Sequence, residues 1–197
     1  MAAMQGARGI INMIDALSVM LKANLTAKGD YMTLEHELSL LEHYLYIQNI
    51  RFRGNIRFQS NIDEEAKACM IPKLILQPIV ENAILHGIES NNQGGTLRLR
   101  ATCEAEEVLL CIEDDGAGIP AEKLEEINHA LRDVRPSAKE HGIGMQNVHS
   151  RIQMLYGEAY GIRVFSTIGK GTCVQLRLPK RLKAREDNDE ISCHDCR

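Results

Sequence analysis

The sequence lacks tryptophan altogether, and aromatic residues make up only 4% of its 197 positions, so a core must rest on aliphatic side chains and methionine. It also lacks long apolar runs, since none approaches the roughly 20 residues that a helix needs to cross a bilayer. The start of the chain has no charged leader followed by an apolar stretch, which is the pattern of a signal peptide. Taken alone, the chain is expected to be soluble.

An excess of positive charge is missing as well. The formal net charge is −4, which gives no reason to expect nucleic acid as a partner. With 44% hydrophobic and 25% charged residues, the composition is typical of a soluble globular protein with a real core. The length suits one domain of ordinary size with an appendage, or two small ones.

The cysteines do not form the framework of a small disulfide-rich protein. Cys103, Cys111 and Cys173 lie inside strand-like apolar runs, where a free cysteine behaves as a small hydrophobic residue. This favours a reducing cytosol. Near the C-terminus, Cys193 and Cys196 flank a histidine, but a structural zinc site needs four ligands and no second ligand pair is evident. An inert tail is therefore favoured there over a metal or redox site.

Two heptad-like stripes of apolar residues predict helices in the first fifth of the chain. Thr33 offers an N-cap for the second helix, with two glutamates in its first turn to suit the helix dipole. Packing against the following domain and participation in a dimerising helical hairpin both remain open. The first stripe is Ile10, Ile14, Leu17 and Leu21, and the second is Leu34, Leu38, Leu41, Leu45 and Gln48.

After residue 54 the pattern changes to alternating strands and helices, which predicts an α/β unit with one sheet covered by helices. Pro72 is expected to open a helix that runs to Gly87, and Pro78 inside it is expected to kink that helix. Strands are predicted at 56–62, 96–103, 107–114, 162–168 and 172–178, helices at 120–132 and 145–156, and a loop at 133–143.

The segment 77–87 places two polar side chains within an apolar helix. Asn82 and His86 are four residues apart and so share a face. A buried asparagine amide needs a partner, and one such partner is a Mg²⁺ ion that also holds phosphate oxygens. Alone, the segment reads more simply as an asparagine satisfied by backbone and a capping or core histidine.

Three glycine-containing segments follow. Asp114 ends a strand and precedes Gly116 and Gly118, which permit a tight turn and close approach of the backbone to a ligand. An ionised carboxylate can accept a hydrogen bond from the amino group of an adenine. Gly142 and Gly144 open a helix, an arrangement that can cradle phosphate. The last segment, 169–172, is a hairpin turn before a strand. Each signal is weak alone.

Taken together and in this order, the four segments resemble the N box and the successive glycine boxes of the GHKL (Bergerat-fold) ATP-binding superfamily. Within it, IPKLILQPIVENAILHGI, GIGMQNVHSRIQMLYGEAYGI and GKGTCVQLRLP are similar to LytS/YehU-type bacterial sensor histidine kinases. The stretch TLEHELSLLEHYLYIQNIRFRGNI resembles the linker helix of that family. The likeness covers about residues 10–179, and it implies an α+β two-layer sandwich with a mixed sheet of about five strands and helices on one face.

The resemblance also implies ligands and roles. ATP and Mg²⁺ would be bound, with Asn82 ligating the metal, Asp114 accepting from the adenine amino group and Thr172 assisting through water. Residues 120–141 would form the ATP lid. The catalytic candidates are Asn82, Glu81 and His86, and the nucleotide-binding set is Asn82, His86, Asp114, Gly116, Gly118, Ile119, Gly142, Ile143, Gly144, Met145 and Thr172.

The sequence departs from the family pattern at three points. Leu85 stands where many histidine kinases have a lysine, which leaves His86 as a weak candidate for phosphate neutralisation. Pro78 occupies the position of the catalytic glutamate of gyrase-type ATPases, which argues against a water-activating ATPase. No Pro-His-Phe motif of a phospho-acceptor is present, and His36 and His43 read as solvated helix histidines.

The resulting expectation is a piece of a longer kinase. Residues 1–53 would be a helical remnant of the dimerisation and linker region, 54–179 the ATP-binding catalytic domain and 180–197 a disordered tail. The intact protein would be a membrane-anchored homodimer with this part in the cytoplasm. It would transfer phosphate to a histidine on its dimerisation helix and then to a response regulator receiver domain. The alternatives are a GHKL serine kinase that regulates a sigma factor, and a non-catalytic module that binds ATP.

Overall fold

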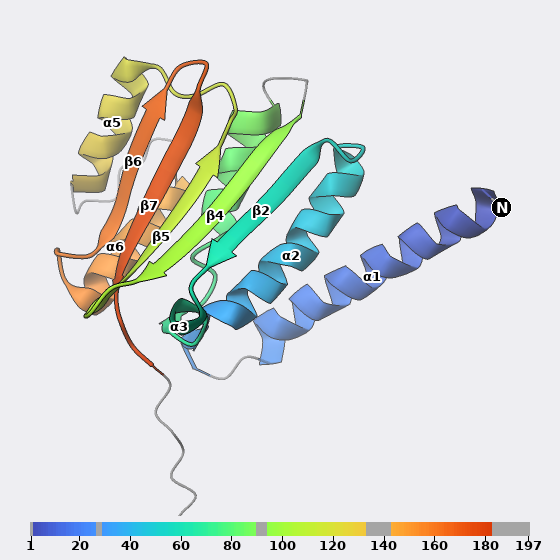
Figure 1. Ribbon diagram of the computed structural model, residues 1–197, viewed down its shortest axis with the longest axis horizontal. Coiled ribbons are helices and arrows are strands. Elements are labelled where there is room, and N and C mark those ends of the chain that lie inside the picture. Colours follow the sequence, from blue (N-terminus) through green and yellow to red (C-terminus); the bar gives the residue numbers. More distant parts are fainter. Residues whose placement is uncertain (1, 27–28, 90–93, 133–142, 183–197) are drawn as a thin grey trace, which may run out of the picture.

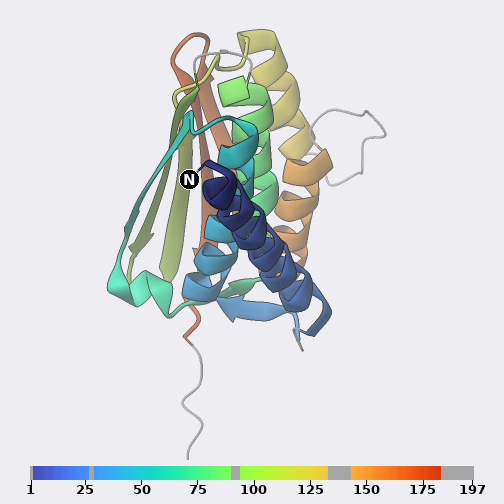
Figure 2. The ribbon, with the colours of Figure 1, turned by 90° about the vertical axis from the view of Figure 1, so that its right-hand side faces the viewer.

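The computed structural model describes residues 2–26, 29–89, 94–132 and 143–182. Five strands form one mixed sheet, and the helices lie on one face of it (Figures 1 and 2). This confirms the predicted two-layer α+β architecture. In spatial order the strands are β2 (Ile56–Ile62), β4 (Gly95–Cys103), β5 (Glu107–Asp114), β7 (Gly171–Pro179) and β6 (Gly161–Thr167).

The sheet contains one parallel pair, between β2 and β4, and its other neighbours are antiparallel. Alternation of side chains along each strand decides which face is covered. On β4, for example, Leu97, Leu99 and Ala101 are fully buried against the helices. The intervening residues point to the opposite face, which no helix covers in the described part of the chain.

The second stripe of apolar residues is buried as one face of α2 (Leu34–Arg51). Thr33 caps this helix as predicted, because its hydroxyl accepts a hydrogen bond from the backbone N–H of His36 at 3.2 Å. Leu34, Leu41 and Leu45 join the core under the sheet. The helices that follow α2 along the chain are α3 (Glu64–Lys67), α4 (Gln77–Asn82), the π-helix η1 (Ala83–Ile88), α5 (Ala121–Arg132) and α6 (Ile143–Tyr156).

The first stripe of apolar residues, in contrast, remains largely exposed. The helix α1 (Ala2–Thr26) packs against α2 and otherwise projects away from the body of the domain (Figure 1). It contributes Ala16 and Met20 to the packed interior. Its stripe residues Ile10, Ile14, Leu17 and Leu21 are 45–62% exposed. Packing against the following domain therefore accounts for the second stripe and not for the first.

The helix expected to begin at Pro72 begins instead at Gln77, so that prediction is wrong. Pro72 ends a short strand, β3 (Met70–Pro72), which pairs with β1 (Tyr31–Thr33). Leu74 then adopts a left-handed backbone conformation with φ of 57°, which no helix can contain.

The kink predicted at Pro78 is also absent. Because the helix starts later than expected, the proline falls in its first turn, where the backbone nitrogen has no partner to lose. The irregularity of this segment lies further on, at Ala83, where the helix widens to a π-helix.

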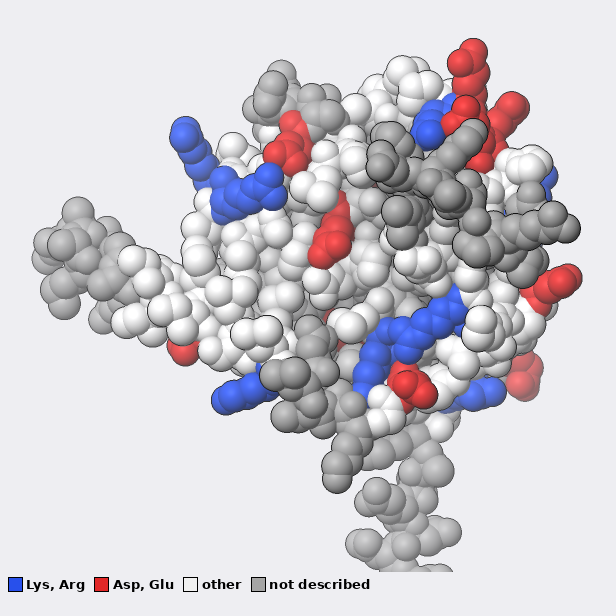
Figure 3. Space-filling view, turned by 180° about the vertical axis from the view of Figure 1, so that it is seen from behind, with Lys and Arg blue, Asp and Glu red and all other residues white. Residues whose placement is uncertain are grey.

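In the described ranges, no helix is long and apolar enough to span a bilayer. The helix-bearing side, seen in Figure 3, mixes positive and negative side chains over a largely uncharged surface. Residues 180–182, which the sequence had assigned to a tail, make backbone contacts: Lys180 donates to Glu106 at 2.8 Å and Leu182 forms a bridge with Cys69. Residues 183–197 lie outside the described part of the chain.

Candidate functional site

Asp114 is the last residue of β5 and lies under the helical layer with 7% of its surface exposed. Its Oδ1 accepts a hydrogen bond from the backbone N–H of Gly116 at 2.9 Å. Burial raises the pKa of the carboxyl from 3.8 to about 6, against the opposing effect of backbone hydrogen bonds from Gly116 and Thr172. The group is therefore mainly ionised at neutral pH and acts as a buried acceptor.

The turn after Asp114 requires glycine at two places because backbones approach one another closely. A Cβ on Gly116 would overlap the backbone of Gly87, at the end of the N box. Gly118 has a φ of 70°, and a Cβ there would overlap the carbonyl of Thr167. The backbone N–H of Ala117 also donates to the carbonyl of Gly87 at 3.1 Å. These contacts bring the first and second predicted motifs together.

Asp115 has a structural task that the sequence did not reveal. Its Oδ1 accepts from the backbone N–H of Thr96 at 2.6 Å, and its own N–H donates to the Thr96 carbonyl at 3.3 Å. The pair ties the glycine turn to β4. The two neighbouring aspartates are thus divided, with Asp115 fixing the turn and Asp114 turned into the interior.

The fourth motif reaches the same place from β7. Thr172 pairs with Asp114 across the β5–β7 ladder. Its hydroxyl lies 2.9 Å from that of Ser166, which also accepts from the backbone N–H of Ile119 at 2.8 Å. Ser166 was missed by the sequence reasoning, since a serine in a strand carries no distinctive signal.

Asn82 ends α4, and its Nδ2 atom is buried and has no hydrogen-bond partner among the described residues. The π-helix begins at the next residue, and such wide turns are frequent at functional sites. Gly144, in the first turn of α6, stands opposite: a Cβ on it would lie 3.8 Å from Asn82 Nδ2. The N box and the third motif therefore face each other.

The other predicted residues are less central. Glu81 Oε1 accepts from Gln77 Nε2 at 2.9 Å, and Glu81 lies close enough to Tyr44 of α2 to add to the rise in the tyrosine pKa that burial chiefly causes. Glu81 is thus placed beside α2. His86 and Leu85 are exposed. Met145 is buried in the core at 7% exposure and Ile143 opens α6, whereas Gly142 and residues 133–141 of the predicted lid lie outside the described residues.

The residues present suit a magnesium nucleotide. An orphaned buried amide is costly unless a ligand completes its hydrogen bonds. Rotation of the amide plane exchanges its oxygen and nitrogen, so Asn82 can offer either a metal ligand or a donor to phosphate. Mg²⁺ retains several waters and needs only one or two protein oxygens when substrate phosphates supply others. One amide at this position is therefore sufficient.

Glu37 was missed by the sequence reasoning and is the main anchor of the N box. It is 2% exposed, and its carboxylate accepts from three successive backbone N–H groups, those of Leu74 at 2.9 Å and of Ile75 and Leu76 at 2.7 Å. These bonds join α2 to the start of the helix that carries Asn82. A glutamate on the buried face of a predicted helix was the available signal.

A hollow of about 960 Å³ lies around β6, α5 and α6, and its lining residues include Asn128, Arg163 and, next to the candidate site, Ser166. It contains neither Asn82 nor Asp114. The buried polar groups, which need a ligand, are the better guide to the site than the size of this open hollow.

Comparison with known proteins agrees with this geometry. Residues 71–182 match the family model of the histidine kinase-, DNA gyrase B- and HSP90-like ATPases, and residues 1–56 match that of histidine kinase. The first match spans more than half of the chain, so the chain belongs to this ATPase family. The resemblance predicted from the motifs is confirmed.

Among individual proteins, the chain is 34% identical over 172 residues to the sensor histidine kinase YesM of Bacillus subtilis, which covers 87% of this chain and 28% of YesM. The catalytic domain of histidine kinase ThkA, in a nucleotide-free form, aligns with a TM-score of 0.58 at 16% identity over 78% of this chain and 97% of that domain. ThkA in complex with the response regulator protein TrrA aligns with a TM-score of 0.52 at 17% identity over 87% of this chain and 49% of that one. The chain spans less than a third of the length of the curated relatives it matches.

Proposed function

We propose that this chain is the ATP-binding catalytic domain of a sensor histidine kinase. The observation that carries the proposal is the occurrence together of a buried carboxyl group, that of Asp114, and a buried amide nitrogen without a partner among the described residues, Nδ2 of Asn82. The two lie at the ends of a strand and a helix that glycine contacts hold together. This division of polar groups suits a ligand with a base at one end and phosphates at the other.

Asp114 selects adenine by charge. Adenine presents an amino group at the position where guanine presents a carbonyl oxygen, so a fixed carboxylate attracts the first and repels the second. The glycine turn holds this carboxylate in place, because Gly116 packs against the backbone of Gly87 and Gly118 against the carbonyl of Thr167. Thr172 and Ser166 form the hydroxyl pair beside the carboxylate and complete the polar end of the candidate site.

Asn82 and the start of α6 receive the phosphates. The N–H groups of the first turn of this 14-residue helix are free of intrahelical partners and favour anions. Asn82 would ligate Mg²⁺, and the ion would supply positive charge to offset that of the phosphates. Leu85 in place of a lysine leaves this neutralisation to the metal, the helix N-terminus and His86.

Phosphoryl transfer then breaks the bond between the γ-phosphorus and its bridging oxygen and forms a phosphorus–nitrogen bond on a histidine, with ADP leaving. The acceptor belongs to a helix outside this sequence, since no Pro-His-Phe motif is present. The phosphate then passes to an aspartate of a response regulator, and ThkA, crystallised with such a protein, supports this partner.

The parent protein acts as a homodimer through α1, with this part in the cytoplasm beneath a membrane anchor. The exposed stripe of Ile10, Ile14, Leu17 and Leu21 supports the dimer, because four apolar residues on one helical face are costly in water. Leu17→Glu is expected to convert dimer to monomer in light scattering. Val19→Glu, on the other side of the same helix, is the matched control and leaves the dimer intact.

Calorimetric titration with ATP and Mg²⁺ tests the nucleotide site. The unmutated chain is expected to bind ATP. Asp114→Asn is expected to bind ATP about 10- to 100-fold more weakly, since a hydrogen bond to a charged group contributes ~1.5–3 kcal/mol. Asn82→Ala is expected to remove the dependence of affinity on Mg²⁺. Glu158→Gln, an exposed change, is the control. Equal ATP affinity of Asp114→Asn and the unmutated chain would refute the assignment of Asp114 as the adenine acceptor.

The kinase step needs a separate assay. The full-length parent, incubated with ATP labelled at the γ-phosphate, is expected to gain acid-labile label, the property of phosphohistidine. Label stable to acid would indicate a serine kinase instead. Nucleotide binding without any label would indicate a module that holds ATP as a conformational signal.

A further inference from the structure

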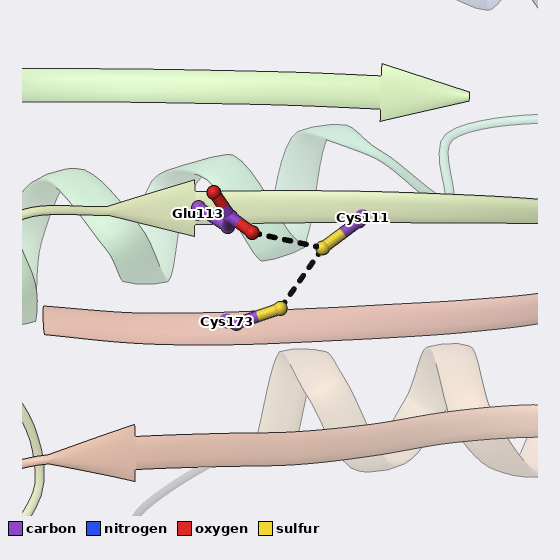
Figure 4. A group of neighbouring side chains, drawn as sticks. All are labelled: Cys111, Glu113 and Cys173. Carbon is purple, nitrogen blue, oxygen red and sulfur yellow. Dashed lines mark hydrogen bonds between the residues drawn. The ribbon is translucent and has the colours of Figure 1, made fainter. Parts of the chain in front are cut away.

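Three side chains that could ligate a metal ion meet on the open face of the sheet, away from the helical layer (Figure 4). Glu113 of β5 stands opposite Cys173 of β7, and Cys111 lies two residues before Glu113 on the same face. The two sulfur atoms are 2.9 Å apart, and Cys111 Sγ lies 3.6 Å from Glu113 Oε1. Among the described residues, no other group of three such ligands was found.

The two thiols face each other across the β5–β7 ladder at hydrogen-bond distance, and either sulfur can be the donor. Cys111 is 8% exposed, whereas Cys173 and Glu113 are half-buried and leave the group open to an ion from solvent.

Arg100 balances the charges of the cluster. Its guanidinium pairs with Glu113 from the neighbouring strand β4. When both thiols are deprotonated, two thiolates, one carboxylate and one guanidinium sum to −2. A divalent cation would bring the sum to zero. A carboxylate that ligates a metal is commonly held by an outer hydrogen bond of this kind.

We propose that Cys111, Cys173 and Glu113 form a binding site for a divalent cation of the zinc class, with water as the fourth ligand. Thiolate ligands favour such ions over Mg²⁺ or Ca²⁺. Tetrahedral zinc, with Zn–S of about 2.3 Å and Zn–O of about 2.0–2.2 Å, requires a sulfur–sulfur distance of about 3.8 Å and sulfur–oxygen distances of about 3.5 Å. The observed 3.6 Å suits the second distance, and the sulfurs must separate by less than one ångström for the first.

The site would fasten β5 to β7 directly beneath the candidate nucleotide site. The Glu113–Cys173 pair is next in the ladder to the Asp114–Thr172 pair, and alternation sends the two pairs to opposite faces. A bound ion would therefore hold the backbone from which Asp114 projects. The proposal does not depend on nucleotide binding, because the cluster and its geometry stand without it.

Zinc binding by the reduced 197-residue chain tests the proposal. Cys193→Ser and Cys196→Ser are first introduced together, so that the C-terminal cysteines cannot contribute. Competition with a chromophoric chelator is expected to show one Zn²⁺ per chain. Cys111→Ser and Cys173→Ser are each expected to weaken binding at least 100-fold, and Glu113→Gln about 10-fold or more.

The matched control is Cys103→Ser, which alters the second pair of facing thiols, with Cys69 at 4.0 Å, and is expected to bind zinc normally. Co²⁺ is expected to give a thiolate charge-transfer absorption that Cys111→Ser and Cys173→Ser lose. Circular dichroism verifies folding, and Cys173→Ala, at a half-buried position, replaces any variant that does not fold. Zinc binding that persists without Cys111 and Cys173, no binding at all, or a Cys111–Cys173 disulfide in the freshly purified protein would each overturn the proposal.

Discussion

Replacing Glu37 is expected to loosen the start of the N box and destabilise the domain. The carboxylate accepts three backbone hydrogen bonds in a site that is 2% exposed. Glu37→Gln keeps one oxygen for Ile75 and Leu76 but turns an NH₂ group toward the N–H of Leu74. Leaving one buried donor unsatisfied costs ~1–3 kcal/mol. Glu37→Ala abandons all three donors and is expected to cost about 3 kcal/mol or more, a large share of a typical domain's ~5–15 kcal/mol.

Urea unfolding measures the loss, and Glu35→Gln, an exposed change on the same helix, is the control. Hydrogen exchange shows where stability is lost, because the amides of Leu74, Ile75 and Leu76 are expected to lose protection first. ATP affinity is expected to fall as well, since the helix carrying Asn82 starts at this anchor. If Glu37→Ala costs no more than Glu35→Gln, the three hydrogen bonds do not hold the segment and the reasoning is refuted.

The remaining predictions concern pH and the glycine turn. Burial raises the pKa of Glu37 from 4.5 to about 7, so between these two pH values the folded state holds a proton that the unfolded state has released. The free energy of unfolding should therefore fall as pH rises from 4.5 to about 7, by up to about 3 kcal/mol. Glu37→Gln should lack that fall. Because the pKa of Asp114 is about 6, ATP affinity in calorimetry should decline as pH drops below that value, and the decline should approach about tenfold per pH unit. An unchanged affinity at about pH 5 would contradict the proposed role of Asp114 as the adenine acceptor. Gly118→Ala should destabilise by more than ~1 kcal/mol in thermal unfolding, because its Cβ would overlap Thr167, whereas Gly9→Ala in open space should be neutral or stabilising.

The five strands of the main sheet could be predicted from sequence because each is a short alternating or continuous apolar run bounded by turn residues. The two hairpins are local in the chain, so β4 with β5 and β6 with β7 follow directly from these patterns. Asp114 and its glycine turn were predictable for the same reason. The motif order then predicted that distant segments share one site, and two of these segments are in contact at Gly87 and Gly116.

The errors lie where tertiary contacts decide local structure. Proline at the start of an apolar run usually opens a helix, but at Pro72 the partner strand β1 holds the segment extended. The bonds from Glu37 then delay the helix by five residues, from 72 to 77. Neither interaction leaves a signal within the segment itself. The thiol cluster was overlooked because Cys111 and Cys173 are 62 residues apart and meet only through the β5–β7 ladder.

The β5–β7 ladder is also the part of the sheet that is expected to form last during folding. It joins Asp114 to Thr172, so 58 residues must be spanned before the first pair can form, whereas each hairpin closes over a short turn. Long-range closure costs more chain entropy and slows folding. The domain is therefore expected to fold as two pieces, β2–β4–β5 and β6–β7, that dock last. Because the proposed adenine acceptor, Asp114, stands on β5 and Thr172 stands on β7, a nucleotide that touches both is expected to bind only the closed sheet and to shift the folding equilibrium toward it.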